Sequence, residues 1–140
     1  MNPAEPLRVG VLPLARPTFD VPYAEQVWEE AWKLMEQIPV DWVGSSDLLF
    51  DAQSVESQLL EFKKEPLDLL LVLQLTFTDA SMTVKLAETF DVPLLFWSFP
   101  EKRTGGRLRL NSLCGVNLAA HALGKSGIQC DYLNLNPQDP

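Results

Sequence analysis

Leu67-Asp68-Leu69-Leu70-Leu71-Val72-Leu73 is an apolar run interrupted only by Asp68, and the polar segment Gln74-Leu75-Thr76-Phe77-Thr78-Asp79 follows it directly. The run is too short to cross a bilayer, and it predicts a strand buried on both faces, as in a parallel sheet. A helical pattern begins right after the polar segment, which places that segment at the carboxyl end of the strand. Ligands of open α/β sheets bind at that edge.

Helical and extended patterns alternate along the rest of the chain. Apolar residues at spacings of three and four predict helices over 22–38, 51–62, 78–90 and 111–123. Further strands are predicted over 7–14, 40–43, 94–99 and 130–135, with Pro13 and Pro17 ending the first. The order βαβαβαβαβ predicts a single α/β domain over residues 1–140. Its fold class is a three-layer, flavodoxin-like (Rossmann-like), doubly wound parallel sheet of five strands in the order 2-1-3-4-5.

The composition narrows the classes of partner. The chain has 140 residues, 46% of them hydrophobic, and a formal net charge of −8. This acidity argues against nucleic acid and anionic membranes as partners. Cys114, Cys130 and a single histidine match no metal motif, and residues 1–6 do not look like a secretion signal, so we expect a cytoplasmic protein. The tail 136–140 has no helix behind it, which suggests one domain of a longer protein.

Several catalytic signatures are absent from the sequence. It contains neither GxGxxG nor GxxxxGK[ST], the backbone cradles for phosphates, and no GxSxG nucleophile turn. His121 falls in a helical pattern beside alanines, where packing or partial exposure is the ordinary role. No catalytic residue is therefore predicted in this chain.

Polar side chains follow four predicted strands and form a rim. The rim comprises Arg16 and Asp20, then 45–47, 74–79 and 98–112. A neutral sugar needs hydrogen-bonding groups and an apolar surface for its C–H faces, which Phe77 between two threonines provides. The same Thr, Ser and Asp residues also suit helix caps, so both roles stay open. The basic loop 101–109 suits an anion, an acidic neighbouring subunit, or plain solvation.

Three of these segments resemble a known family. Leu75–Met82, Pro93–Leu95 and Leu110–Ser112 resemble the N-terminal domain of L-arabinose and L-fucose isomerase-like proteins, over a region from the first strand to about Gly127. The resemblance implies part of a metal-dependent aldose–ketose isomerase. It also implies Mn²⁺ or another divalent metal, held by acidic and histidine ligands of later domains, with an acidic side chain moving the proton.

The resemblance also implies substrate-facing residues. Phe77 matches the aromatic residue of the third-strand loop, while Asn111 and Ser112 match the polar start of the fourth helix. Arabinose isomerases have glutamine and histidine where Ser112, Leu113 and Cys114 stand, so the same pentose need not be the substrate. With the rim, the predicted substrate-binding residues are Arg16, Gln74, Thr76, Phe77, Thr78, Asn111 and Ser112. The expected partners are a sugar and the remaining isomerase domains or neighbouring subunits, and no metal ligand is predicted in this chain.

Two other classes of protein share parts of this pattern. Sugar-binding lobes of the periplasmic type also have a short first strand and a return like Asp91-Val92-Pro93. A flavodoxin-like interaction domain without a ligand is the third reading.

Overall fold

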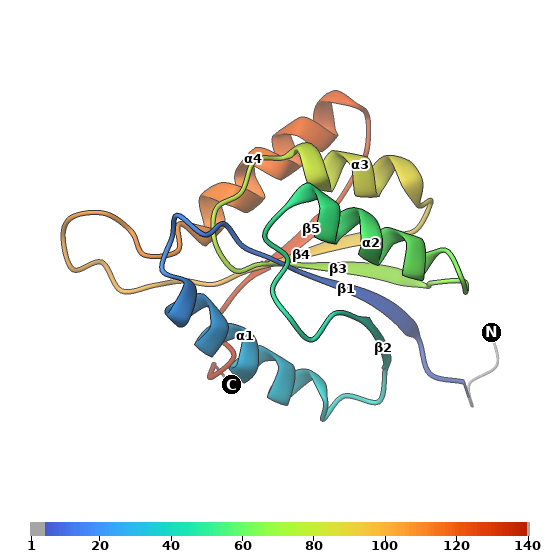
Figure 1. The fold of residues 1–140 in the computed structure, drawn as a ribbon, viewed down its shortest axis with the longest axis horizontal. Helices are drawn as coiled ribbons and strands as arrows, with labels where there is room; N and C mark the ends of the chain where they lie inside the picture. Colours follow the sequence, from blue (N-terminus) through green and yellow to red (C-terminus); the bar gives the residue numbers. More distant parts are fainter. Residues whose placement is uncertain (1–4, 140) are drawn as a thin grey trace.

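A computed structural model describes residues 5–139, and the predicted sheet is present in it. Five parallel strands pair in the order β2-β1-β3-β4-β5, as expected from the sequence (Figure 1). The strands are β1 (Arg8–Leu14), β2 (Asp41–Gly44), β3 (Leu69–Gln74), β4 (Leu94–Ser98) and β5 (Asp131–Asn134). The helices are α1 (Val21–Met35), α2 (Ala52–Phe62), α3 (Ser81–Thr89) and α4 (Ser112–Lys125).

The helices cover the two faces of the sheet unequally. Helix α1 lies on one face, whereas α2, α3 and α4 lie on the other (Figure 1). Alternate residues of the central strands enter the two cores, since Leu71 and Leu73 pack on the α1 side and Leu70 and Val72 on the opposite side. Both faces of β3 are therefore buried, which explains its continuous apolar sequence.

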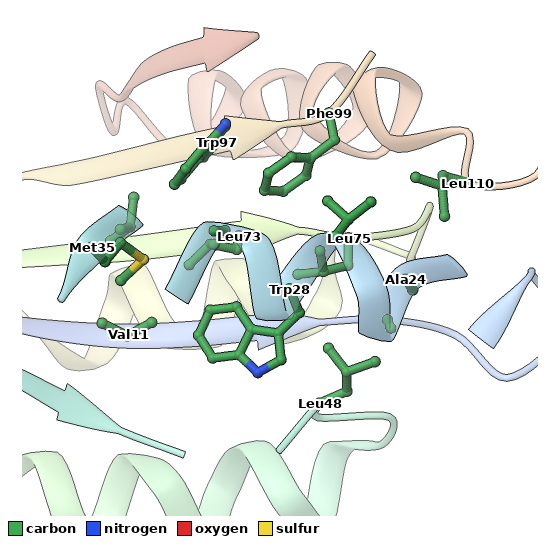
Figure 2. Packing of buried hydrophobic residues seen from close by; sticks show 14 of the residues in the cluster. Val11, Ala24, Trp28, Met35, Leu48, Leu73, Leu75, Trp97, Phe99 and Leu110 are labelled. Atoms are coloured by element: carbon green, nitrogen blue, oxygen red, sulfur yellow. The ribbon is translucent and has the colours of Figure 1, made fainter. Parts of the chain in front are cut away.

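Helix α1 packs on the sheet through a tryptophan. Trp28 and Ala24 are buried with Val11, Leu73 and Trp97 (Figure 2). The indole Nε1 of Trp28 donates to the carbonyl oxygen of Ser46 at 2.8 Å. This tryptophan therefore belongs to the helix–sheet core, as its helical spacing predicts.

The first strand ends at Leu14, as the sequence predicted, although it contains a proline. Pro13 pairs with Leu73 inside β1, and its carbonyl oxygen accepts from the Leu49 amide at 2.8 Å. The pairing of β1 with β2 ends at Val11 and Gly44. The Pro13 nitrogen faces the side where β2 has already ended, so its missing N–H costs no sheet hydrogen bond.

Helix α1 ends three residues before the predicted boundary at Ile38. The amide of Ile38 donates to the Met35 carbonyl at 2.9 Å, and Trp42 Nε1 donates to the same oxygen at 2.8 Å. These contacts satisfy the end of the helix through a tighter turn and a side chain. Helix α2 begins as expected, since the Asp51 carboxylate accepts from the Ser54 amide at 2.7 Å.

Candidate functional site

A pocket lies where the segments after β1, β3 and β4 meet, at the carboxyl edge of the sheet. Its volume is about 390 Å³, and we call it the rim pocket. It is lined by Arg16, Thr18, Phe19, Phe77, Arg107, Leu108 and Asn111. Three of the predicted substrate-binding residues, Arg16, Phe77 and Asn111, thus come together from distant parts of the sequence. The pocket is within the size range of small-molecule sites.

Two arginines and two aromatic rings define the walls of the rim pocket. The rings of Phe19 and Phe77 have centroids 6.2 Å apart. The guanidinium carbon of Arg16 lies 5.6 Å from the Phe77 centroid, and that of Arg107 lies 5.0 Å from the Phe19 centroid. The rings hold each guanidinium group by cation–π attraction.

The two arginines differ in their ionic partners. Arg16 Nη2 lies 3.3 Å from Asp79 Oδ2, whereas Arg107 forms no ion pair within the described part of the chain. Hydrogen bonds from the Ser81 hydroxyl and amide, with a smaller contribution from Arg16, lower the pKa of Asp79. Arg107 is therefore the cation of this pocket whose charge a ligand can use.

The other four predicted residues form a buried polar cluster below the pocket. Gln74, Thr76, Thr78 and Ser112 are 0%, 0%, 3% and 2% exposed, respectively. Gln74 Nε2 donates to the Thr76 carbonyl at 2.9 Å and to Thr78 Oγ1 at 2.8 Å. The Ser112 hydroxyl donates to the Gln74 carbonyl and accepts from the Phe99 amide. The cluster joins the ends of β3 and β4 to the start of α4.

The buried polar cluster also fixes the segments that line the pocket. The Arg16 amide donates to Thr76 Oγ1 at 2.8 Å, and the Phe77 amide donates to the Leu110 carbonyl at 2.8 Å. Ser98, expected at this edge, is buried and donates to Asn134 Oδ1 at 2.9 Å. These hydrogen bonds hold the backbone of the rim, while the buried Gln74 Oε1 has no hydrogen-bond partner among the described residues.

The basic loop after β4 is fixed at its base. Arg109 Nε donates to Asp20 Oδ2 at 2.7 Å, and the Asp20 amide donates to the Arg109 carbonyl at 3.1 Å. The Arg109 guanidinium carbon lies 3.9 Å from the Tyr23 centroid. The hydrogen bond from Arg109, followed by that from the Tyr23 amide, lowers the pKa of Asp20. The start of α1 and the end of the loop are thus joined.

Sequence reasoning placed Arg107 in the basic loop beside the rim but not among the substrate-binding residues, and it did not single out Phe19 or the role of Glu101. Glu101 accepts hydrogen bonds from loop backbone amides that carry no sequence signature. Its position as the one acidic residue in an otherwise basic loop was the available signal. Phe19 offered a weaker signal, as an aromatic residue in a loop between two prolines and a helix.

The opposite edge of the sheet also has hollows. One of about 410 Å³ is lined by Phe90, Asp91 and Gly127 among others, and one of about 570 Å³ is lined by Ala120, Cys130 and Asp131 among others. Both lie where β4 begins, away from the carboxyl ends of the strands. They lack the arginines and the facing aromatic rings of the rim pocket, which is therefore the better candidate site.

The described residues do not form a group typical of a catalytic metal site. Within residues 5–139, no three His, Cys, Asp or Glu side chains are grouped to hold an ion. His121 is exposed on α4, and Cys114 and Cys130 are free thiols. Burial, followed by the charge of Asp131, raises the pKa of Cys130.

The described part of the chain also has no helix with the length and apolarity needed to span a bilayer.

Comparisons with known proteins point to one family. The model of the fucose/sulfoquinovose isomerase N-terminal domain matches residues 10–139. Sulfoquinovose isomerase of Priestia aryabhattai is 30% identical over 112 residues, which cover 80% of this chain and 25% of that protein. The enzyme of Alkalicoccus urumqiensis is 29% identical over 133 residues, covering 95% of this chain and 30% of that protein.

The chain thus spans between a quarter and a third of the length of these relatives. The crystal structure of a lac repressor dimer bound to operator is similar over 95% of this chain and 56% of that one, with 12% identity and a TM-score of 0.45. This similarity is too weak to indicate a function. The family model covers nearly the whole chain. Of the three interpretations of the sequence, it supports the N-terminal domain of a sugar isomerase. The chain belongs to the family of fucose/sulfoquinovose isomerase N-terminal domains.

Proposed function

We propose that this domain recognises the substrate and takes part in assembly within a metal-dependent aldose–ketose isomerase, and that the rim pocket faces the sugar. The observation that carries the proposal is the convergence of an aromatic face, an amide and an unpaired guanidinium at the carboxyl edge of the sheet. Phe77 provides an apolar surface for C–H groups, and the Asn111 amide both donates to and accepts from hydroxyls.

The charge of the pocket favours a sugar with an anionic group. Sulfoquinovose, in the names of the relatives, is a hexose that bears a sulfonate. A guanidinium group binds such oxyanions through paired N–H donors. Arg107 has no carboxylate partner in the described part of the chain and is the residue we assign to the sulfonate.

The chemical step is assigned to other parts of the assembled enzyme. Within residues 5–139, no three metal-ligating side chains are grouped. In the proposed enzyme, Mn²⁺ or another divalent ion is held by later domains or neighbouring subunits, and this chain is not catalytic alone. We place the enzyme in the cytoplasm, where free thiols such as those of Cys114 and Cys130 stay reduced.

The test compares Arg107→Gln with wild type in the complete enzyme that carries this domain. We expect the KM for sulfoquinovose to rise roughly tenfold, since a charge-assisted hydrogen bond contributes about 1.5–3 kcal/mol. The KM for an uncharged hexose should change less than twofold. Lys63→Gln is the matched control, because Lys63 is exposed at the end of α2, at the opposite edge of the sheet. If the KM for sulfoquinovose is the same in wild type and in Arg107→Gln, the assignment of Arg107 to the sulfonate is wrong.

Assembly is tested separately. Lys102 and Arg103 are exposed at the start of the basic loop in an otherwise acidic chain, and they suit an acidic neighbouring subunit. We expect the double variant Lys102→Gln/Arg103→Gln to dissociate at lower salt than wild type in sedimentation experiments. An unchanged salt dependence would leave these two charges as solvated surface.

A further inference from the structure

We propose that Glu101 is a positioning residue of the rim pocket, because its carboxylate sets the backbone that presents Asn111 and the Arg107–Leu108 wall. This inference rests on the proposed function of the pocket. Glu101 follows β4 after a two-residue link and stands at one end of the basic loop. Arg109, Leu110 and Asn111 stand at the other end, immediately before α4.

The carboxylate of Glu101 uses both oxygens on three consecutive amides. Oε1 accepts from the Arg109 amide at 2.6 Å, and Oε2 accepts from the Leu110 and Asn111 amides at 2.7 and 3.3 Å. Hydrogen bonds to an ionised carboxylate are shorter and stronger than those between neutral groups. A single side chain therefore joins the two ends of the loop.

The backbone held by Glu101 has an unusual conformation. Asn111 has φ 54°, the one positive φ outside glycine in the described chain. Such a conformation is uncommon for a residue with a side chain and persists where the surroundings fix it. Leu110 is fully buried beside Phe99 (Figure 2), and its carbonyl accepts from the Phe77 amide. Glu101 and the Leu110 anchor together determine where the Asn111 side chain leaves the backbone.

The fold itself depends little on Glu101. The loop from 102 to 107 is exposed, and a Cβ added to Gly105 or Gly106 would meet no atom within 4 Å. The pair between Arg109 and Asp20 and the buried Leu110 remain when Glu101 is changed. Loss of the carboxylate should therefore loosen the pocket wall and leave the two cores intact.

The test uses Glu101→Gln in the complete enzyme, with Glu88→Gln as the control. Glu88 is an exposed residue of α3 outside the pocket. The amide of Gln keeps the size of the side chain but replaces one acceptor oxygen by an NH₂ group, which cannot accept from a backbone amide. We expect hydrogen exchange at Arg109, Leu110 and Asn111 to accelerate at least tenfold. The KM for sulfoquinovose should rise about three- to tenfold because the competent pocket is less populated, with kcat within twofold.

Other outcomes contradict the inference in distinct ways. A lower melting temperature and lower kcat at unchanged KM would show a purely structural role. Glu101→Asp keeps the charge with a shorter reach, so its KM should lie between those of wild type and Glu101→Gln, and a KM equal to that of Glu101→Gln would oppose a role for the charge. If Asn111→Gly raises KM and Glu101→Gln does not, the inference fails while the proposed function stands. If neither variant raises KM, the inference fails, and the Arg107→Gln comparison decides separately whether the proposed function stands.

Discussion

The buried polar cluster and the rim pocket are built from neighbouring residues of the same segments, but the residues of the cluster are buried, whereas those of the pocket are accessible to a ligand. Thr76 and Thr78 are buried on either side of Phe77, which is partly exposed in the pocket. Ser112 is buried directly after Asn111, which lines the pocket. Adjacent residues of these segments thus differ in burial, and hydrogen bonds within the polar cluster hold the buried ones inside the molecule. Polar chemistry at a strand end therefore does not by itself identify a ligand contact.

Ser112→Ala tests the role of the buried polar cluster, and we expect it to have the largest effect on stability. The change removes the partner of the buried Gln74 carbonyl and of the buried Phe99 amide. Unfolding free energy should fall by about 2–3 kcal/mol in urea titrations. The control Ser126→Ala, at the exposed end of α4, should change it by less than about 0.5 kcal/mol. A raised sugar KM with full stability would instead assign Ser112 to the pocket.

Gly115→Ala tests how closely the buried polar cluster is packed. A Cβ at this position would lie 2.9 Å from Gln74 Cγ and Nε2, and the fully buried Gln74 has no room to move. We expect a loss of about 1–3 kcal/mol in unfolding free energy. Gly124→Ala in the same helix meets no atom within 4 Å and should be neutral or stabilising by up to about 1 kcal/mol. Equal effects of the two substitutions would mean that the cluster adapts easily.

Asn111→Ala and Asn111→Gly together test the role of Asn111 in the rim pocket. Both remove the amide, but only glycine adopts φ 54° without strain. Alanine should therefore lower the unfolding free energy by about 1 kcal/mol relative to glycine, measured by thermal or urea unfolding. Both variants should raise the KM for the sugar to a similar extent. Wild-type KM in Asn111→Gly would show that the amide does not contact the substrate.

Asp20→Asn should have the smallest effect, and it depends on pH. The folded-state pKa of Asp20 lies below its ordinary value of 3.8, mainly because of Arg109. The contact therefore stabilises the fold at pH values above the unfolded pKa, and this contribution disappears as the pH falls through the folded pKa. Asparagine can still cap α1. The melting temperature of the variant should be slightly lower than that of wild type at pH 7, and the two should converge as the pH falls through the folded-state pKa of Asp20. A constant difference at all pH values would contradict this origin.

The fold followed from the sequence because its determinants are local or periodic. The apolar run before Gln74 and the single helical pattern between successive strands specify a parallel sheet with β3 at its centre. The end of α1 could not be foreseen, since it depends on the Trp42 side chain from the following strand. Element types are set by the segment itself, whereas boundaries are set by its neighbours.

The candidate site was only partly visible in the sequence. Arg16, Phe77 and Asn111 were grouped correctly because parallel strands deliver their carboxyl ends to one edge. Gln74, Thr76 and Thr78 were predicted to face the ligand on chemistry alone, and their burial in the described domain leaves that role without supporting contacts. Glu101 could not be identified because its partners are backbone amides, which every residue except proline has.

Closure of the basic loop by Glu101 has a consequence for the length of that loop. Because the ends at Glu101 and Arg109 are already held together, extra residues between them add only the entropy of a longer closed segment. That entropy grows with the logarithm of length, so doubling the loop costs about 0.6 kcal/mol. Insertions at Gly105–Gly106, where an added Cβ would meet no atom within 4 Å, should therefore be tolerated with little loss of stability. In the proposed enzyme, a longer loop at this point would change how far the domain reaches toward the substrate or a neighbouring subunit.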